Sequence, residues 1–102
     1  MNTFFGPDGW VEFMQKETSH CKLPPNLAVF CLNPDKMFRQ RLLKATQIVE
    51  EGRPIVITSV LRQSELKSNL AIRSILESEN VMFVQGPEKS VLVQLLHLFG
   101  PR

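Results

Sequence analysis

Cys31 is the residue whose type and position come closest to a reactive centre. Its thiol lies near the end of an apolar run, Leu27–Leu32, two residues before Asn33-Pro34, a pair typical of a helix start. The dipole of a helix favours a thiolate near its N-terminus, so Cys31 is a candidate nucleophile. Cysteine in an apolar strand also packs well in a protein core, and this second interpretation stays open.

No pattern around Cys31 completes a catalytic centre. The sequence has no Ser-His-Asp or Cys-His arrangement of recognisable spacing, and its carboxylates form no obvious acid–base pair. We therefore predict no catalytic residue, and the balance of the sequence favours a protein that is not an enzyme.

Polar residues follow three apolar runs, Leu27–Leu32, Ile55–Leu61 and Val81–Val84. If these runs form parallel strands, their carboxyl ends meet at one rim of the sheet, where α/β proteins bind ligands. The same residue types also serve capping and solubility, so a small-molecule site or an enzyme active site at this rim is an alternative hypothesis. The candidate ligand-binding residues on the rim are Cys31, Asn33, Ser59, Arg62, Gln85 and Lys89.

Basic residues gather after the first run, which makes nucleic-acid binding a further alternative, because Lys and Arg side chains contact phosphate backbones. These residues are Lys36, Arg39, Arg41 and Lys44. Acidic residues are interspersed with them, and the net charge of +2 is too small to support this hypothesis by itself.

Familiar cofactor and metal motifs are absent from the sequence. No glycine-rich dinucleotide loop follows an apolar run, and no phosphate-binding loop of the Walker type occurs. The histidines and cysteines, His20, Cys21, Cys31 and His97, lack the paired spacing of a metal site. We therefore predict no cofactor and no metal.

The alternation of segments predicts the fold. Each apolar run is followed by a helix-like segment, and these are Pro34–Glu51, Ser64–Glu79 and Glu88–Phe99. Such alternation is typical of βαβ units. We predict an α/β fold with a small three-stranded parallel sheet, flanking helices and an N-terminal helical cap. The strand order 2-1-3 is the simplest with right-handed crossovers.

A chain of 102 residues fits a single domain, 1–102. We expect residues 1–25 to form an aromatic helical segment with a connector, and residues 26–102 to form the βα units. Asp8, Asn33 and Ser64 are the expected helix caps, and Gly52 is expected to end the helix before the second strand.

The stretch RPIVITSVLRQSELKSNLAIRSILESENVMFVQG, residues 53–86, resembles the opening strand-helix-strand of the second RecA-like domain of helicases. In both, an apolar strand ends in Thr or Ser before a polar helix. The stretch covers about a third of the chain and contains no diagnostic motif. The resemblance therefore implies a parallel α/β architecture and no particular activity.

The last helix-like segment is apolar almost all round, and a small monomer struggles to cover such a helix. We expect a homodimer or other homo-oligomer whose interface includes Val91, Leu92, Leu95, Leu96 and Phe99. Pairing through one of the two exposed edges of a three-stranded sheet is the alternative. The leading hypothesis is a small non-catalytic binding or regulatory protein that acts through protein–protein contacts, with a second copy or another protein as its partner.

The location expected from the sequence is cytoplasmic. The N-terminus lacks the basic start and apolar stretch of a secretory signal, and Leu27–Leu32 is far too short to span a bilayer. Two cysteines are too few for a disulfide framework. We therefore expect no membrane partner.

Overall fold

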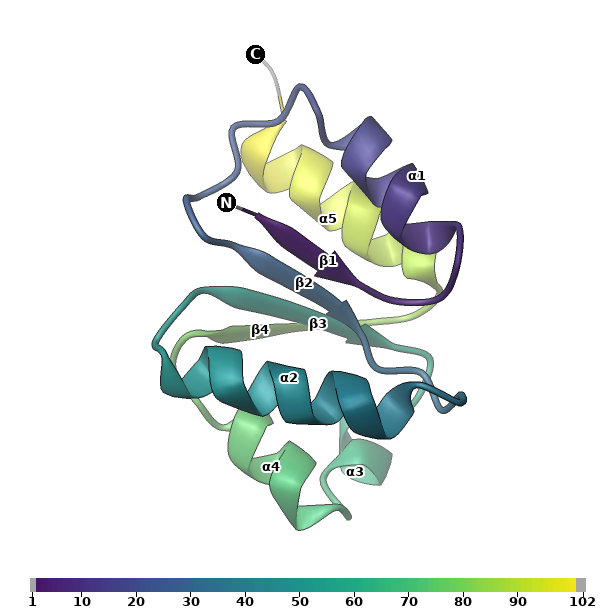
Figure 1. The fold of residues 1–102 in the computed structure, drawn as a ribbon, viewed down its shortest axis with the longest axis vertical. Helices are drawn as coiled ribbons and strands as arrows, with labels where there is room; N and C mark the ends of the chain where they lie inside the picture. The colour runs from purple at the N-terminus through teal and green to yellow at the C-terminus, as the bar shows by residue number, and fades with distance from the viewer. Residues whose placement is uncertain (1, 101–102) are drawn as a thin grey trace.

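The computed structural model describes residues 2–100, which form a parallel sheet covered by helices on both faces (Figure 1). The strands are β1 (Thr3–Phe5), β2 (Ala28–Cys31), β3 (Ile55–Ser59) and β4 (Val81–Gln85). The helices are α1 (Trp10–Glu17), α2 (Phe38–Glu50), α3 (Gln63–Leu66), α4 (Leu70–Leu76) and α5 (Glu88–Phe99). The predicted α/β class, with a parallel sheet and flanking helices, is confirmed.

The sheet has four strands rather than three, and the predicted order 2-1-3 is wrong. The strands lie in the order β1-β2-β3-β4, and every neighbouring pair is parallel. The additional strand, β1, has three residues, which are too few for an alternating pattern to show in the sequence. The ring of Phe5 stacks on Phe30 of β2 with the ring centroids 4.4 Å apart, and this contact helps to hold β1 at the sheet edge.

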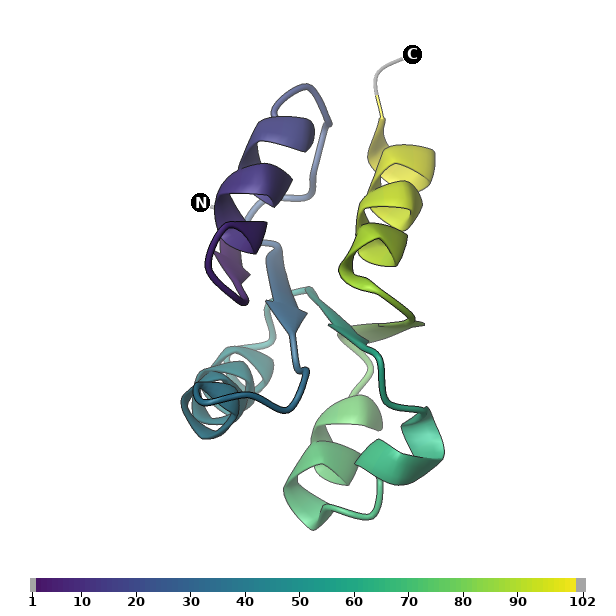
Figure 2. The ribbon, with the colours of Figure 1, turned by 90° about the vertical axis from the view of Figure 1, so that its right-hand side faces the viewer.

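Different helices cover the two faces of the sheet. α1 and α5 lie on one face, where Met14 and Val91 belong to the same buried cluster. α2 and α4 lie on the other face, where Ile48 and Ile75 pack in a second cluster with Phe30. Figure 2, which looks along the strands, shows this division of the helices above and below the sheet.

The connection from β1 to β2 through α1 has an unusual hand. The strands step in one direction across the sheet, yet α1 lies on the face opposite to α2 and α4. The connection from β1 to β2 is therefore left-handed, whereas the next two have the usual right hand (Figure 2). In the predicted order 2-1-3, right-handed connections would place helices on both faces because the second connection steps across the sheet in the opposite direction to the first. In the structure every connection steps in the same direction, and α1 reaches the second face because its connection has the opposite hand.

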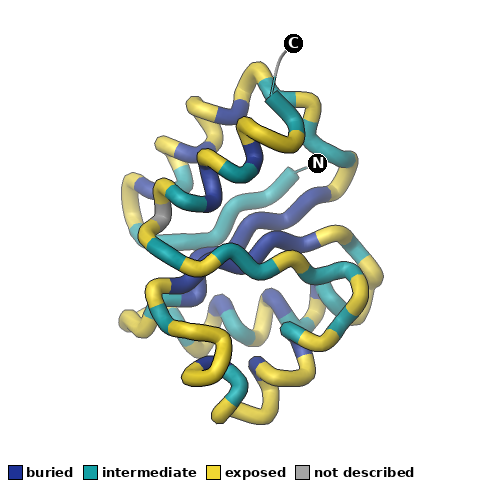
Figure 3. The backbone as a smooth tube through the Cα atoms, turned by 180° about the vertical axis from the view of Figure 1, so that it is seen from behind, coloured by how far each residue is buried: buried dark blue, intermediate teal, exposed yellow. Residues whose placement is uncertain are grey.

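The two central strands are buried along their whole length, whereas residues of β1 and β4 are partly exposed (Figure 3). The run that begins at Ile55 has no apolar–polar alternation, and the structure shows the reason, because helices cover both faces of β3. β1 and β4 are the edges of the sheet.

The predicted helix caps are wrong. The N-cap of α1 is Gly9 rather than Asp8, α2 begins at Phe38 rather than Pro34, and α3 follows Arg62 rather than Ser64. Asn33 does not cap α2 because its side-chain oxygen accepts a hydrogen bond from the N–H of Val60, at 2.8 Å. That contact to a different strand end could not be seen from the neighbouring residues in the sequence.

The predicted helix Ser64–Glu79 is two helices, α3 and α4. Asn69 begins the second, because its side-chain oxygen accepts hydrogen bonds from the N–H groups of Ala71 (2.9 Å) and Ile72 (3.3 Å). The predicted end of α2 is confirmed: Gly52 follows the C-cap with a φ of 77°, a left-handed conformation that glycine adopts without strain.

We expect Asn69→Ala to lower the free energy of unfolding by about 1 kcal/mol, because two N–H groups of α4 lose their acceptor. Chemical denaturation measures this change. Ser64→Ala is the matched control, since Ser64 lies in α3 but does not provide its cap, and it should change the stability by much less. Equal effects of the two substitutions would contradict the assignment of the cap to Asn69.

Candidate functional site

Two of the predicted ligand-binding residues tie together the loops that follow β2 and β3. The N–H of Val60 donates to Asn33 Oδ1 at 2.8 Å. The hydroxyl of Ser59 donates to the carbonyl oxygen of Leu32 at 3.2 Å and accepts a bond from the N–H of Leu61 at 3.1 Å. Asn33 and Ser59 therefore shape the rim at the carboxyl ends of the strands by holding its loops in place.

The other predicted ligand-binding residues differ in their exposure. Cys31 is fully buried in β2, within the cluster between the sheet and the helices α1 and α5. This position suits core packing and gives a dissolved substrate no access to the thiol. Arg62, Gln85 and Lys89 are exposed: Arg62 precedes α3, Gln85 is the last residue of β4, and Lys89 lies in the first turn of α5.

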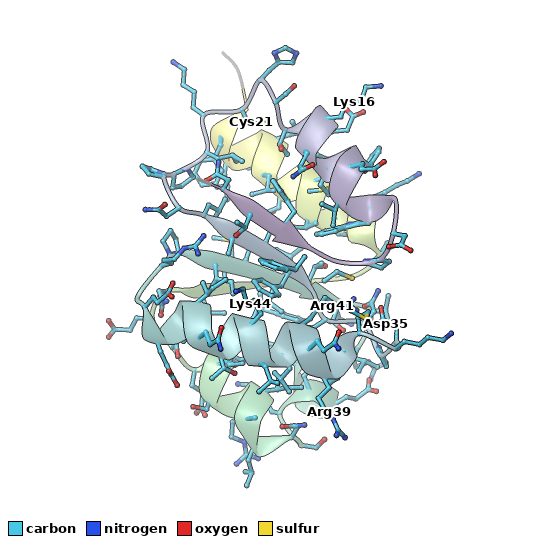
Figure 4. All side chains as sticks on the ribbon, in the orientation of Figure 1. Lys16, Cys21, Asp35, Arg39, Arg41 and Lys44 are labelled. Atoms are coloured by element: carbon cyan, nitrogen blue, oxygen red, sulfur yellow. The ribbon has the colours of Figure 1, made fainter. Side chains whose placement is uncertain are left out.

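The four basic residues do not share one surface. Arg41 is 6% exposed and forms an ion pair with Asp35, while one of its terminal N–H groups also donates to the carbonyl oxygen of Asn33 at 3.3 Å. Arg39 points away from Arg41 on the opposite side of α2 (Figure 4). Lys36, in the loop before α2, lines a pocket together with Arg41, and Lys44 is exposed on α2. Arg39 therefore lies apart from Arg41, and the guanidinium of Arg41 is already paired.

A crevice lies at the rim where the chain leaves β1 toward one face and β2 toward the other. In α/β sheets such divergence opens a space outside the strand ends. Two adjoining pockets, of about 230 Å³ and 260 Å³, occupy this place, and both are lined by Gly6, Asp8, Met37 and Arg41. Gly6 lies against Trp10: a Cβ added there would stand 2.3 Å from the indole ring.

The ion pair beside this crevice sets the local electrostatics. The hydrogen bond from Arg41 is the largest cause that lowers the pKa of Asp35 below its ordinary value, with a smaller contribution from the N–H of Met37, which donates at 2.9 Å. Partial burial acts in the opposite direction and raises this pKa. About a third of the Asp35 side chain is exposed (33%), so solvent screens the pair from one side.

One hydrogen-bond donor of the Arg41 side chain has no acceptor among the residues that the structure describes. This donor is the N–H at Nε, which is buried. A buried ion pair contributes little net stability, because desolvation of the charges offsets their attraction. A buried guanidinium at the wall of a crevice is therefore a candidate functional group. The sequence shows Arg41 only as one of several basic residues in α2, and its ion pair joins residues six positions apart.

The apolar last helix is only partly available as an interface. Val91, Leu92 and Leu95 of α5 are buried in the core of the chain itself, and Phe99 packs against that core. Leu96 is 40% exposed. The exposed apolar side chains of α5 also include Val93 and Leu98, neither of which was among the predicted interface residues.

An edge of the sheet is a second exposed apolar feature. The outer side of β4, which we call the open edge, pairs with no strand among residues 2–100. Figure 3 shows β4 crossing the front of the molecule with no other segment in front of it. β4 carries no charged residue, and its Met82 is 42% exposed. The predicted order 2-1-3 also left this strand at a sheet edge, but it placed the strand beside the first predicted strand, β2, rather than beside β3.

Comparison of the chain with protein-family models, curated proteins and solved structures finds no match. Among the described residues, no group of three or more His, Cys, Asp or Glu side chains is placed to hold a metal ion. No helix in the same part of the chain is long and apolar enough to cross a membrane. The candidate functional features of the described chain are therefore the rim, the crevice and the open edge.

The ion pair predicts a pH dependence of stability. The pKa of Asp35 is lower in the folded chain than its ordinary value of 3.8, so its contribution is present above that value and is lost as the pH falls through the folded pKa. Asp35→Asn should lower the free energy of unfolding at neutral pH. The difference from the unchanged protein should shrink below about pH 3.8, as measured by urea denaturation over a pH series. A difference that is constant with pH would show that the charge of Asp35 does not matter.

Proposed function

We propose that this protein is a small non-catalytic binding protein that works as a homodimer. The dimer contact uses the open edge of β4 together with the exposed apolar residues of α5. The observation that carries the proposal is an edge strand without charge, next to a helix that exposes Val93, Leu96 and Leu98. A cytoplasmic location remains part of the proposal.

Edge strands present unpaired backbone groups, and monomeric proteins usually protect them. Common protections are a charged side chain, a proline or a β-bulge within the strand. β4 has the sequence VMFVQ, which contains neither charge nor proline, and it pairs with β3 residue for residue without a bulge. An unprotected edge of this kind favours pairing with another chain.

The arrangement of the rim supports the non-catalytic part of the proposal. Cys31 is buried, and Asn33 and Ser59 bind backbone groups of neighbouring loops. The dispersal of the basic residues, with Arg41 in an ion pair, likewise leads us not to propose nucleic-acid binding.

We expect Met82→Lys to weaken the homodimer by about tenfold or more, because it places a charge in the contact and costs at least about 1.4 kcal/mol of binding free energy. Sedimentation equilibrium over a micromolar concentration range measures the dissociation constant. Leu70→Lys is the matched control, since Leu70 is an exposed apolar residue on α4 (75% exposed) and lies outside the proposed contact.

A monomeric unchanged protein throughout this range would contradict the proposed function. A dimer that Leu70→Lys weakens as much as Met82→Lys would place the contact elsewhere on the molecule.

The crevice supports a second candidate function, the binding of a small molecule. The specific observation is the buried Arg41 in the wall of a crevice at the point where the connections diverge. Apolar surface from Phe4, Val11 and Met37 lies in the same place as the charged groups, which suits a ligand with an apolar body and a polar group.

NMR screening of a small-fragment library tests this second candidate. Fragments that bind in the crevice should shift the amide signals of Gly6, Asp8 and Met37, and Met37→Glu should abolish these shifts by filling the crevice with a charged side chain. Leu43→Glu, at an exposed apolar position of α2 away from the pockets, should leave the shifts unchanged. A library that shifts no crevice amide would remove this candidate.

A further inference from the structure

We infer that the homodimer forms by antiparallel pairing of β4 with β4 of a second copy, centred on Phe83, so that the two sheets join into one. This inference depends on the proposed function and deepens it, because it names the partner strand and the register of the contact.

The backbone of β4 shows which residues face outward. The carbonyl oxygen of Asn80 accepts a hydrogen bond from the N–H of Ile55 at 3.0 Å, and the N–H of Gly86 donates to the carbonyl oxygen of Ser59 at 2.9 Å. Backbone groups along a strand point alternately to its two sides. Met82 and Val84 therefore direct their N–H and C=O groups toward β3, whereas Val81, Phe83 and Gln85 direct theirs away from the sheet.

One of these outward groups already has a partner. The N–H of Val81 donates to the carbonyl oxygen of Ser78 at 3.3 Å. The N–H groups of Phe83 and Gln85 and the carbonyl groups of all three outward residues face away from every strand of the sheet. The open edge thus offers both donors and acceptors over the length of β4.

A two-fold axis beside Phe83 matches these donors to acceptors. Antiparallel pairing around such an axis places Phe83 opposite Phe83 of the second copy, and Val81 opposite Gln85. Hydrogen-bonded pairs in antiparallel sheets recur at every second residue, so all three outward residues fall at hydrogen-bonded positions. The edge is therefore complementary to itself, as a symmetric dimer contact must be.

The side chains also suit this register. Val84 and Phe83 pack on opposite faces of the sheet, and Met82 shares the face of Val84. Met82 of one copy would lie opposite Val84 of the other, so the exposed Met82 becomes covered by an apolar neighbour. The two Phe83 rings would be neighbours on the other face.

Charge does not oppose this pairing. β4 and the residues on either side of it, Asn80 and Gly86, have no charged side chain, so no like charges meet along the paired strands. β1 is a weaker candidate for the same contact, because it offers only three residues.

Hydrogen exchange measured by NMR tests the register directly. We expect the amides of Phe83 and Gln85 to exchange about tenfold or more slowly at concentrations where the dimer predominates than after dilution to the monomer. The amides of Met82 and Val84, which donate toward β3, serve as internal controls and should change much less.

Gln85→Pro provides an independent variant. Proline removes the outward N–H of Gln85 without removing a hydrogen bond to β3, and proline is tolerated in edge strands at such positions. We expect it to weaken the dimer tenfold or more, by about 1.4 kcal/mol or above. Gln85→Thr keeps the N–H and should retain the dimer. Circular dichroism of both variants shows whether they fold. If the proline variant unfolds, hydrogen exchange in the unchanged protein still tests the pairing.

The outcomes separate this inference from the proposed function. A dimer in which Phe83 and Gln85 exchange at the same rate as in the monomer would overturn the β4 pairing and leave the homodimer in place. A protein that stays monomeric would overturn both. Slow exchange of these two amides in the dissociated monomer would also overturn the pairing, because a segment of the same chain would then cover the open edge.

Discussion

The burial of β2 and β3 on both faces is the constraint on which the rest of the structure depends. These strands consist almost entirely of apolar residues and have no polar face that could contact water. Helices must therefore lie on both sides of the sheet, although the chain is short. α1 and α5 supply one layer, and α2 and α4 supply the other. The positions of the crevice and of the open edge follow from this requirement.

The crevice exists because consecutive connections leave the sheet in opposite directions. The chain turns toward α1 after β1 and toward α2 after β2, so the two loops diverge and leave a space at the rim. Arg41 comes from the second turn of α2 and reaches back to this rim, where Asp35 and the carbonyl oxygen of Asn33 hold it. The loop between Asn33 and α2 is thereby bent into an irregular path, which explains why the helix begins later than Pro34.

The sequence predicts the elements better than their arrangement. The apolar run at Ile55 correctly indicated a strand, and Gly52 correctly indicated the end of a helix, because both signals are local. β1 was missed because three residues show no period, and its pairing depends on the distant Phe30. The order 2-1-3 failed although both connections between the three predicted strands have the right hand that was assumed, because these connections step in the same direction across the sheet and leave the other face to α1 and α5.

For the site residues too, the sequence predicts the position in the chain better than the contacts. Asn33 and Ser59 were correctly placed at strand ends, yet their bonding partners are Val60 and Leu32, which come from neighbouring loops. Arg41 was read as a surface charge because it lies among other basic residues in the sequence, whereas its place on the inner side of α2 follows from the packing of Ala45 and Ile48 on the sheet. Chemistry that arises from contacts between distant segments cannot be read from local spacing.

The open edge is the remaining consequence of sequential strand order. With β2 and β3 in the centre, the last strand must lie at an edge, and the chain after it is used for α5, which covers the face rather than the edge. Burying Val91, Leu92 and Leu95 against the sheet leaves no segment among the described residues that could also pair with β4. An apolar edge strand that is exposed to water favours aggregation, because its unpaired backbone groups can form hydrogen bonds with any strand that they meet. A second copy of the same edge satisfies these groups in a closed arrangement, and closure is what separates a dimer from open-ended aggregation.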